Sequence, residues 1–292
     1  MKPSKALLFL SSLVAILALI ASGAGLFWPA GEGQPFNITS VRGDEVRING
    51  QGLYQHDTTF KAPILRGADA VTVFIAVPLL IAAIVLASKG RLRGQLLLAG
   101  LLSYFLYNAI SLALGAFFNE LVLVYVVYFS ASLFAFILAF SAVDVDQLAA
   151  RISARAPRRG MAIFMFVAGL TVFVWLPEMI AALLGGPAPA GLGHYTTEVT
   201  YILDPALIAP SAFVASYLLF RAKPLGYLLG VILLILNALV GVIVIGQTVM
   251  QTQAGISLSP GQLIAFVGSF TVMGLFALAL LVKFFGSIAE PA

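Results

Sequence analysis

The chain has no cysteine and only two histidines among its 292 residues. The lack of cysteine excludes structural disulfides, a thiol nucleophile and thiol redox chemistry. It also excludes a zinc site of clustered cysteine and histidine ligands. The sequence contains no phosphate-binding loop, no His-Glu-x-x-His and no Gly-x-Ser-x-Gly, so the soluble enzyme classes built on these motifs are excluded too.

Charged residues are scarce as well. They make up 10% of the chain, whereas 61% of residues are hydrophobic and the mean hydropathy is +1.05; a soluble domain is about a quarter charged. A helix that crosses a bilayer needs about 20 apolar residues. Such runs occur at about 6–28, 70–88, 95–118, 121–142, 161–184, 203–220, 225–250 and 261–282. They predict an all-α integral membrane protein with eight transmembrane helices.

The first apolar run follows the basic start MKPSK, as a signal peptide would. It is longer than the apolar region of a signal peptide and ends without a small-residue cleavage site. We therefore expect a retained first helix, with cleavage as the alternative.

Basic residues are distributed unevenly between the two ends of the predicted helices. One end holds 12 of the 16: Lys2, Lys5, Lys89, Arg91, Arg93, Arg151, Arg155, Arg158, Arg159, Arg221, Lys223 and Lys283. The positive-inside rule places this end, together with both termini, in the cytoplasm. The net charge of +4 then reflects topology and the lipid bilayer as partner, and it requires no nucleic acid.

Two segments are expected outside the bilayer. Residues 29–69 form a loop on the external side, where short alternating runs around the turn RGDE predict a small β-hairpin or meander. On the cytoplasmic side, residues 144–159 combine apolar positions at helical spacing with several arginines. That pattern is typical of a basic amphipathic helix on the inner leaflet, or of a basic loop.

Two similar stretches indicate an internal duplication: GLYQHDTT at 52–59 and GLGHYTT at 191–197. The histidine of each stretch is followed in the same order by an aspartate, a proline and an Asn-Ala pair. The successive spacings, counted from the histidine, are 13, 9 and 30 residues in the first half and 10, 6 and 27 in the second. We predict a 4+4 parallel repeat, with halves 1–146 and 160–292 joined by a basic linker at 147–159. Chance alignment of apolar helices is the alternative.

The carboxylates gather near the outer ends of the helices. Because an ionisable group within a bilayer is costly, we predict that Glu178, Asp204, Tyr201 and Arg66 line one outward-facing polar cavity that binds a proton or a solute. Secondary candidates are His56, His194, Asp69, Glu198 and Glu120. The alternative for Asp204 and Asp69 is that each caps the start of its helix.

Polar residues near the membrane midplane are Asn108, Asn237 and Tyr104. We expect the asparagines to form hydrogen bonds between helices and to hold the bundle together. His56, His194, Asp69 and Asp204 could bind a divalent cation if their loops converge, and this is the weaker hypothesis. The sequence names no cofactor.

The stretches GLYQHD, ADAVTVFIAVPLL and YILDPALIAP together resemble a family of uncharacterised bacterial multi-pass membrane proteins. The resemblance implies a setting in a bacterial inner (plasma) membrane and no activity. From the residues we expect a small-solute or proton-coupled transporter. The alternatives are a membrane enzyme or cofactor-binding protein with its site at the outer face, and an assembly or sensory partner that acts through loop 29–69.

The absence of native cysteine allows a direct test of topology. A cysteine in Gly43→Cys should react with an impermeant thiol reagent in intact cells, because 29–69 is expected outside. A cysteine in Ala156→Cys should react only after permeabilisation. The reverse labelling pattern would overturn the orientation.

Overall fold

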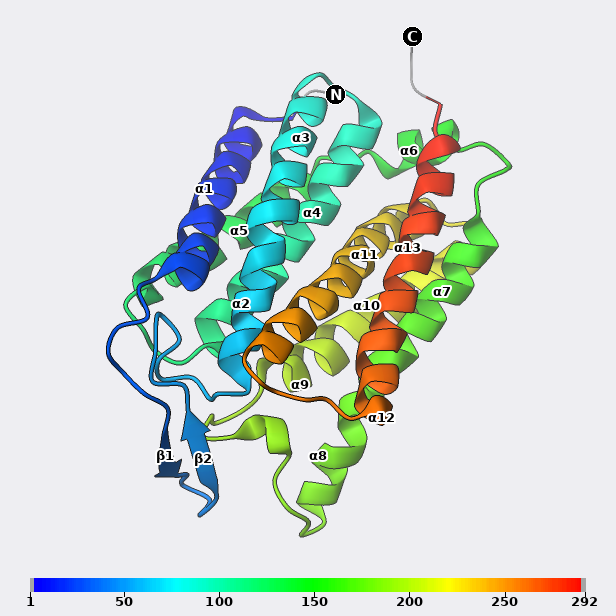
Figure 1. Ribbon diagram of the computed structural model, residues 1–292. Coiled ribbons are helices and arrows are strands. Elements are labelled where there is room, and N and C mark those ends of the chain that lie inside the picture. Colours follow the sequence, from blue (N-terminus) through cyan, green and yellow to red (C-terminus); the bar gives the residue numbers. More distant parts are fainter. Residues whose placement is uncertain (1–2, 290–292) are drawn as a thin grey trace.

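The computed structural model describes residues 3–289, and these form a bundle of long helices with one two-stranded sheet (Figure 1). Within them, eight helices are long and apolar enough to cross a membrane. Their bounds are Lys5–Phe27, Lys61–Ser88, Leu92–Gly115, Val122–Ser141, Arg158–Leu183, Val199–Phe220, Pro224–Gln253 and Ser269–Gly286. The chain is therefore a polytopic membrane protein, and the predicted number of spans is confirmed.

Four of the eight spans change helix type along their length. The second consists of α2 (Lys61–Val71), η1 (Thr72–Ala76) and α3 (Val77–Ser88); the third of α4 (Leu92–Ile110) and η2 (Ser111–Gly115); the fifth of α7 (Arg158–Thr171), η3 (Val172–Trp175) and α8 (Leu176–Leu183); and the sixth of α9 (Val199–Leu203), η5 (Asp204–Ile208) and α10 (Ala209–Phe220). The four regular spans are α1 (Lys5–Phe27), α5 (Val122–Ser141), α11 (Pro224–Gln253) and α13 (Ser269–Gly286), and the short segments α12 (Pro260–Gln262) and η6 (Leu263–Gly268) precede α13. Segments η1, η2, η5 and η6 are π-helical and η3 is 3₁₀.

Two helices begin earlier than the sequence predicts. The second span begins at Lys61, so the loop ends there and Arg66 and Asp69 lie inside the helix. The sixth begins at Val199, which places Asp204 within the span. The interpretation of Asp69 and Asp204 as helix caps is therefore wrong: the N-cap positions are Phe60 and Glu198. A charged residue at each start, Lys61 as the first residue of α2 and Glu198 as the N-cap of α9, hid these starts from a hydropathy reading.

The loop between α1 and α2 contains the expected hairpin. Strands β1 (Phe36–Thr39) and β2 (Glu45–Ile48) pair antiparallel, with Phe36 opposite Ile48 and Thr39 opposite Glu45. Gly43 has a φ of +89° in the connecting turn, a conformation that suits glycine. The prediction of a small β-hairpin is confirmed.

The bundle has a hairpin end, with β1, β2 and α8, and a terminal end, with both chain termini (Figure 1). The basic loops pack together at the terminal end. Arg93 Nη2 donates to the carbonyl of Ile288 (2.7 Å), and Arg158 Nη1 donates to that of Leu219 (3.0 Å). Helix α6 (Val145–Arg151) packs against α11 there. Its Leu148 is fully buried in the protein core, so the segment does not use this residue to bind a lipid surface.

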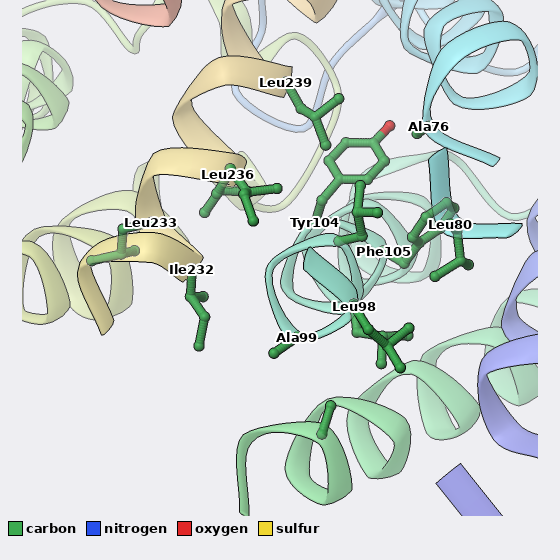
Figure 2. Packing of buried hydrophobic residues seen from close by; sticks show 14 of the residues in the cluster. Ala76, Leu80, Leu98, Ala99, Tyr104, Phe105, Ile232, Leu233, Leu236 and Leu239 are labelled. Atoms are coloured by element: carbon green, nitrogen blue, oxygen red, sulfur yellow. The ribbon is translucent and has the colours of Figure 1, made fainter. Parts of the chain in front are cut away.

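The core of the bundle lies around α4 and α11. Figure 2 shows Leu236 and Leu239 of α11 facing Tyr104 of α4, with Leu80 of α3 close to Phe105. All five side chains are buried. Helix α4 therefore packs between the second and seventh spans, and its polar residues have to find partners on neighbouring helices.

Glycines bring α11 and α13 into backbone contact. A Cβ placed on Gly241 would lie 2.8 Å from the Cα of Gly274 and 3.0 Å from the carbonyl oxygen of Phe270. Small residues at such crossings allow the close approach on which helix packing in lipid depends.

Gly241→Ala should therefore push α11 and α13 apart and destabilise the fold by about 1–3 kcal/mol, as overpacking does. The melting temperature of the purified protein measures the loss of stability, with size-exclusion chromatography used to monitor the folded fraction after heating. The matched control is Gly23→Ala in α1, where the added Cβ meets no atom within 4 Å. Equal melting temperatures for the two variants would contradict the packing argument.

Candidate functional site

A carboxylate lies where an irregular turn interrupts the sixth span. Asp204 is the first residue of η5, and the backbone N–H of Ala209 donates to its carbonyl, five residues back. Pro210 follows and has no N–H to donate, so the regular backbone hydrogen-bond pattern of the helix does not resume at this residue. Turns of this kind recur at functional sites in membrane and soluble proteins.

Both oxygens of the Asp204 carboxyl accept hydrogen bonds from other spans. Tyr107 Oη of α4 donates to Oδ1 (2.9 Å), and Trp175 Nε1 of η3 donates to Oδ2 (3.0 Å). Asp204 is only 8% exposed. The carboxyl group therefore joins the third, fifth and sixth spans.

A second carboxylate is linked to the first through aromatic side chains. Tyr201 is one helical turn before Asp204 and donates from Oη to Glu178 Oε1 (2.5 Å). The rings of Tyr201 and Trp175 lie 5.6 Å apart. Three residues predicted from the sequence thus lie together with two more, and we call Tyr107, Trp175, Glu178, Tyr201 and Asp204 the carboxyl cluster.

Among the residues that the structure describes, the side chains that donate hydrogen bonds to these two carboxyls are neutral: two phenols and one indole. Neutral donors stabilise a negative charge without cancelling it. The cluster can therefore bind a proton or a small cationic group, and its two carboxyls differ in exposure because Glu178 is only half-buried.

The two similar sequence stretches meet at the hairpin end. Tyr195 Oη donates to Asp57 Oδ1 (2.6 Å), and the backbone N–H of Thr58 donates to the same hydroxyl (3.3 Å). Lys61 forms an ion pair with Glu198 (2.6 Å), and its Nζ lies 4.4 Å from the centre of the Tyr195 ring. We call Asp57, Lys61, His194, Tyr195 and Glu198 the interloop cluster.

Burial shifts the pKa values of the loop residues in this cluster. It raises the pKa of the Asp57 carboxyl above the usual 3.8, and the hydroxyl of Tyr195 and the backbone N–H of Phe117 partly oppose the rise. Burial also lowers the pKa of His194 and raises that of Tyr195, the latter with help from the neighbouring Asp57 charge. The ring of Phe117 lies between the two histidines, stacked on His194 (4.9 Å) and tilted against His56 (5.8 Å).

The metal hypothesis finds no geometry to support it. Among residues 3–289, no three His, Asp or Glu side chains are grouped so that they could hold a metal ion. Asp69 is held by Tyr54 and Asp204 by Tyr107, while His56 and His194 pack on Phe117.

Other predicted residues lie apart from the carboxyl cluster. Arg66 is exposed and donates to the carbonyl of Leu26 (3.5 Å), and the exposed Glu120 accepts from Gln55 (3.3 Å). The midplane polar residues take different partners. Asn108 accepts from Tyr128 (3.0 Å), Asn237 donates to Leu233 O in its own helix (2.8 Å), and Tyr104 bonds to Thr72 (2.6 Å). The sequence allows Arg66 or a tyrosine as the hydrogen-bond partner of Glu178 and Asp204, and in the structure the partners are tyrosines, together with Trp175.

Sequence reasoning missed Asp57, Tyr195, Tyr107 and the role of Trp175. Two of them had a visible signal, since Asp57 and Tyr195 directly follow the two histidines of the matched stretches. Which hydroxyl reaches which carboxyl depends on helix rotation, which the sequence does not encode in any short motif.

Comparison with protein-family models, with curated proteins and with solved structures gives no match. Function is therefore inferred from the geometry alone.

The interloop cluster generates a pH-dependent prediction. Because the Tyr195 hydroxyl favours the ionised form of Asp57, Tyr195→Phe should raise the pKa of Asp57 in the folded state further. A folded-state pKa above the unfolded one means that stability falls as pH rises through the folded value. The variant should thus lose about 1–3 kcal/mol at neutral pH and less near the usual aspartate pKa.

Thermal unfolding across a pH series measures the effect. Tyr217→Phe is the control, because Tyr217 is 63% exposed on α10. A loss of stability in Tyr195→Phe that is the same at every pH would contradict the coupling to Asp57.

Proposed function

We propose that this chain is a transporter that moves a small solute across the membrane together with protons, and that the carboxyl cluster binds both. The observation that carries the proposal is the meeting of irregular helix segments at one buried carboxylate. Asp204 lies in η5, its partner Trp175 lies in η3, and Tyr107 lies just before η2.

Irregular backbone at membrane depth supports a transport site. In hydrocarbon, a widened turn leaves backbone groups unsatisfied unless protein or water satisfies them. Many transporters place such broken helices around the substrate, where freed backbone groups and helix ends contact it. An inert bundle would not need two such segments, η3 and η5, to meet at one buried carboxylate.

The chemistry of the cluster favours a proton and a small solute with a cationic or hydrogen-bond-donating group. Protonation of Asp204 or Glu178 would remove a charge that only neutral donors stabilise, and a cationic solute would do the same. Competition for one carboxyl couples binding of the proton to binding of the solute, because each ligand reduces the fraction of protein whose carboxylate is free for the other.

The proposal includes the duplicated architecture and the orientation predicted above. Two observations support a 4+4 repeat. A π-helical turn begins six residues before the proline in both halves, at Thr72 before Pro78 and at Asp204 before Pro210, and the matched stretches of the two loops contact each other. In this register Thr72, not Asp69, is the counterpart of Asp204. The basic terminal end is then cytoplasmic, in a bacterial plasma membrane.

Purified protein in liposomes with an internal pH dye tests the function. A panel of amines, amino acids, sugars and nucleosides is added under an inward proton gradient. Wild-type protein should acidify the interior with the transported class. Asp204→Asn should reduce the rate about tenfold or more, because hydrogen bonds to a charged group are worth about 1.5–3 kcal/mol.

The control is Asp44→Asn, which makes the same chemical change in the exposed hairpin turn and should keep the wild-type rate. Two results would overturn the proposal. One is wild-type protein that moves no protons with any class in the panel, and the other is proton movement that Asp204→Asn leaves unchanged.

A further inference from the structure

A third carboxylate is buried more deeply than those of the carboxyl cluster and belongs to other helices. Asp69 lies in α2 and is completely inaccessible to solvent. Its Oδ2 accepts a hydrogen bond from Tyr54 Oη in the loop before α2 (2.6 Å). Nothing in the proposed transport site uses this residue.

Helix α1 closes over the Asp69 carboxyl. A Cβ on Gly25 would collide with Oδ2 of Asp69 and would lie 2.7 Å from Tyr54 Oη. The backbone of α1 therefore packs directly on the carboxyl–phenol pair. This contact leaves no room for a further side chain, and glycine is the residue that permits it.

Two buried oxygen atoms at this place have no hydrogen-bond partner among the described residues. They are Oδ1 of Asp69 and Oγ of Ser22. Ser22 lies one turn before Gly25 on α1, and its hydroxyl is near the carboxyl. Buried polar atoms without partners are rare, and each requires an explanation.

The nearest cation does not resolve the problem. Arg66 lies one turn before Asp69, but its side chain is exposed and its Nη2 donates to the carbonyl of Leu26. A carboxylate buried without a hydrogen-bonded cation is costly in a bilayer. Donation from Ser22 Oγ to an ionised Oδ1 would pair these two atoms but leave the charge buried. One proton on Oδ1 removes the charge and supplies a hydrogen bond to Ser22 Oγ, so it answers both requirements.

Hydroxyl groups continue on both sides of Asp69. Toward the hairpin end, the hydroxyl of Tyr125 lies beside that of Tyr54, and Asn119 Nδ2 donates to it (3.4 Å). One turn further into the bundle, Thr72 Oγ1 and Tyr104 Oη share a hydrogen bond (2.6 Å). Hydroxyls both donate and accept, so they can pass a proton to and from the carboxyl.

We propose that Asp69 is a reversible proton-binding site, in which Oδ1 carries the proton and donates it to Ser22 Oγ while Tyr54 donates to Oδ2. The site goes beyond the proposed transport function, because it is built from α1, α2 and the loop between them and does not need the carboxyl cluster. Its ligand is a proton, and the tight contact with Gly25 disfavours a metal cation and its shell of oxygen ligands.

Infrared spectroscopy of the full-length protein in lipid nanodiscs, with isotope-labelled aspartate carboxyls, tests the proposal. At neutral pH the wild type should show the C=O band of a protonated carboxyl that Asp69→Asn lacks. The band should disappear as pH rises and return when pH falls. Asp146→Asn, at an exposed position of the terminal end, should keep the band.

Ser22→Ala keeps the Asp69 carboxyl and removes Ser22 Oγ, the acceptor of its proton, so this variant tests the proposal even if Asp69→Asn fails to fold. It should move the C=O band of the protonated carboxyl to higher frequency. An unmoved band in Ser22→Ala overturns the proposal, as does a wild-type spectrum identical to that of Asp69→Asn. Sodium-dependent thermal stabilisation that Asp69→Asn abolishes would also overturn it, in favour of a metal cation. None of these results bears on transport through Asp204.

Discussion

A polar side chain inside the membrane-spanning bundle has to find its hydrogen-bond partner in the protein, because hydrocarbon offers none. Helix α4 shows how far this constraint shapes the structure. Within little more than one turn, it presents Tyr104 to the second span, Tyr107 to the sixth and Asn108 to the fourth. These bonds fix the rotation of α4 relative to three neighbours. The apolar core shown in Figure 2 then fills the space between helices whose orientation the polar contacts have set.

The same constraint explains where glycine is required. Hydrophobic association contributes little between helices in lipid, so close backbone packing takes its place. Gly25 brings α1 onto the carboxyl of Asp69, and Gly241 brings α11 onto Gly274. The first contact has a chemical consequence as well as a structural one. It removes the carboxyl from water and leaves the hydroxyl groups of Tyr54 and Ser22 beside it.

The sequence was sufficient for features that depend on composition and local pattern. Eight spans followed from apolar length, and the hairpin followed from alternation around a turn. Helix starts were misplaced where Lys61 begins α2 and Glu198 caps α9, since a buried ion pair resembles a solvated loop in hydropathy alone. The carboxyl cluster was predicted in part. Glu178, Tyr201 and Asp204 share it, but the choice of tyrosine and tryptophan donors rather than Arg66 depends on how the helices are rotated.

The Lys61–Glu198 ion pair links the two membrane spans that contain a buried aspartate. Lys61 is the first residue of α2 and Glu198 is the N-cap of α9, so the pair joins the starts of the spans that contain Asp69 and Asp204. Their side chains are only 9% and 12% exposed, and separating a buried pair leaves two uncompensated charges. A motion that opens the carboxyl cluster at the hairpin end therefore either breaks this pair at considerable cost or carries both helix starts together. Joint movement of both helix starts with the ion pair intact costs less, and it would make the two matched loops move as one body over the bundle.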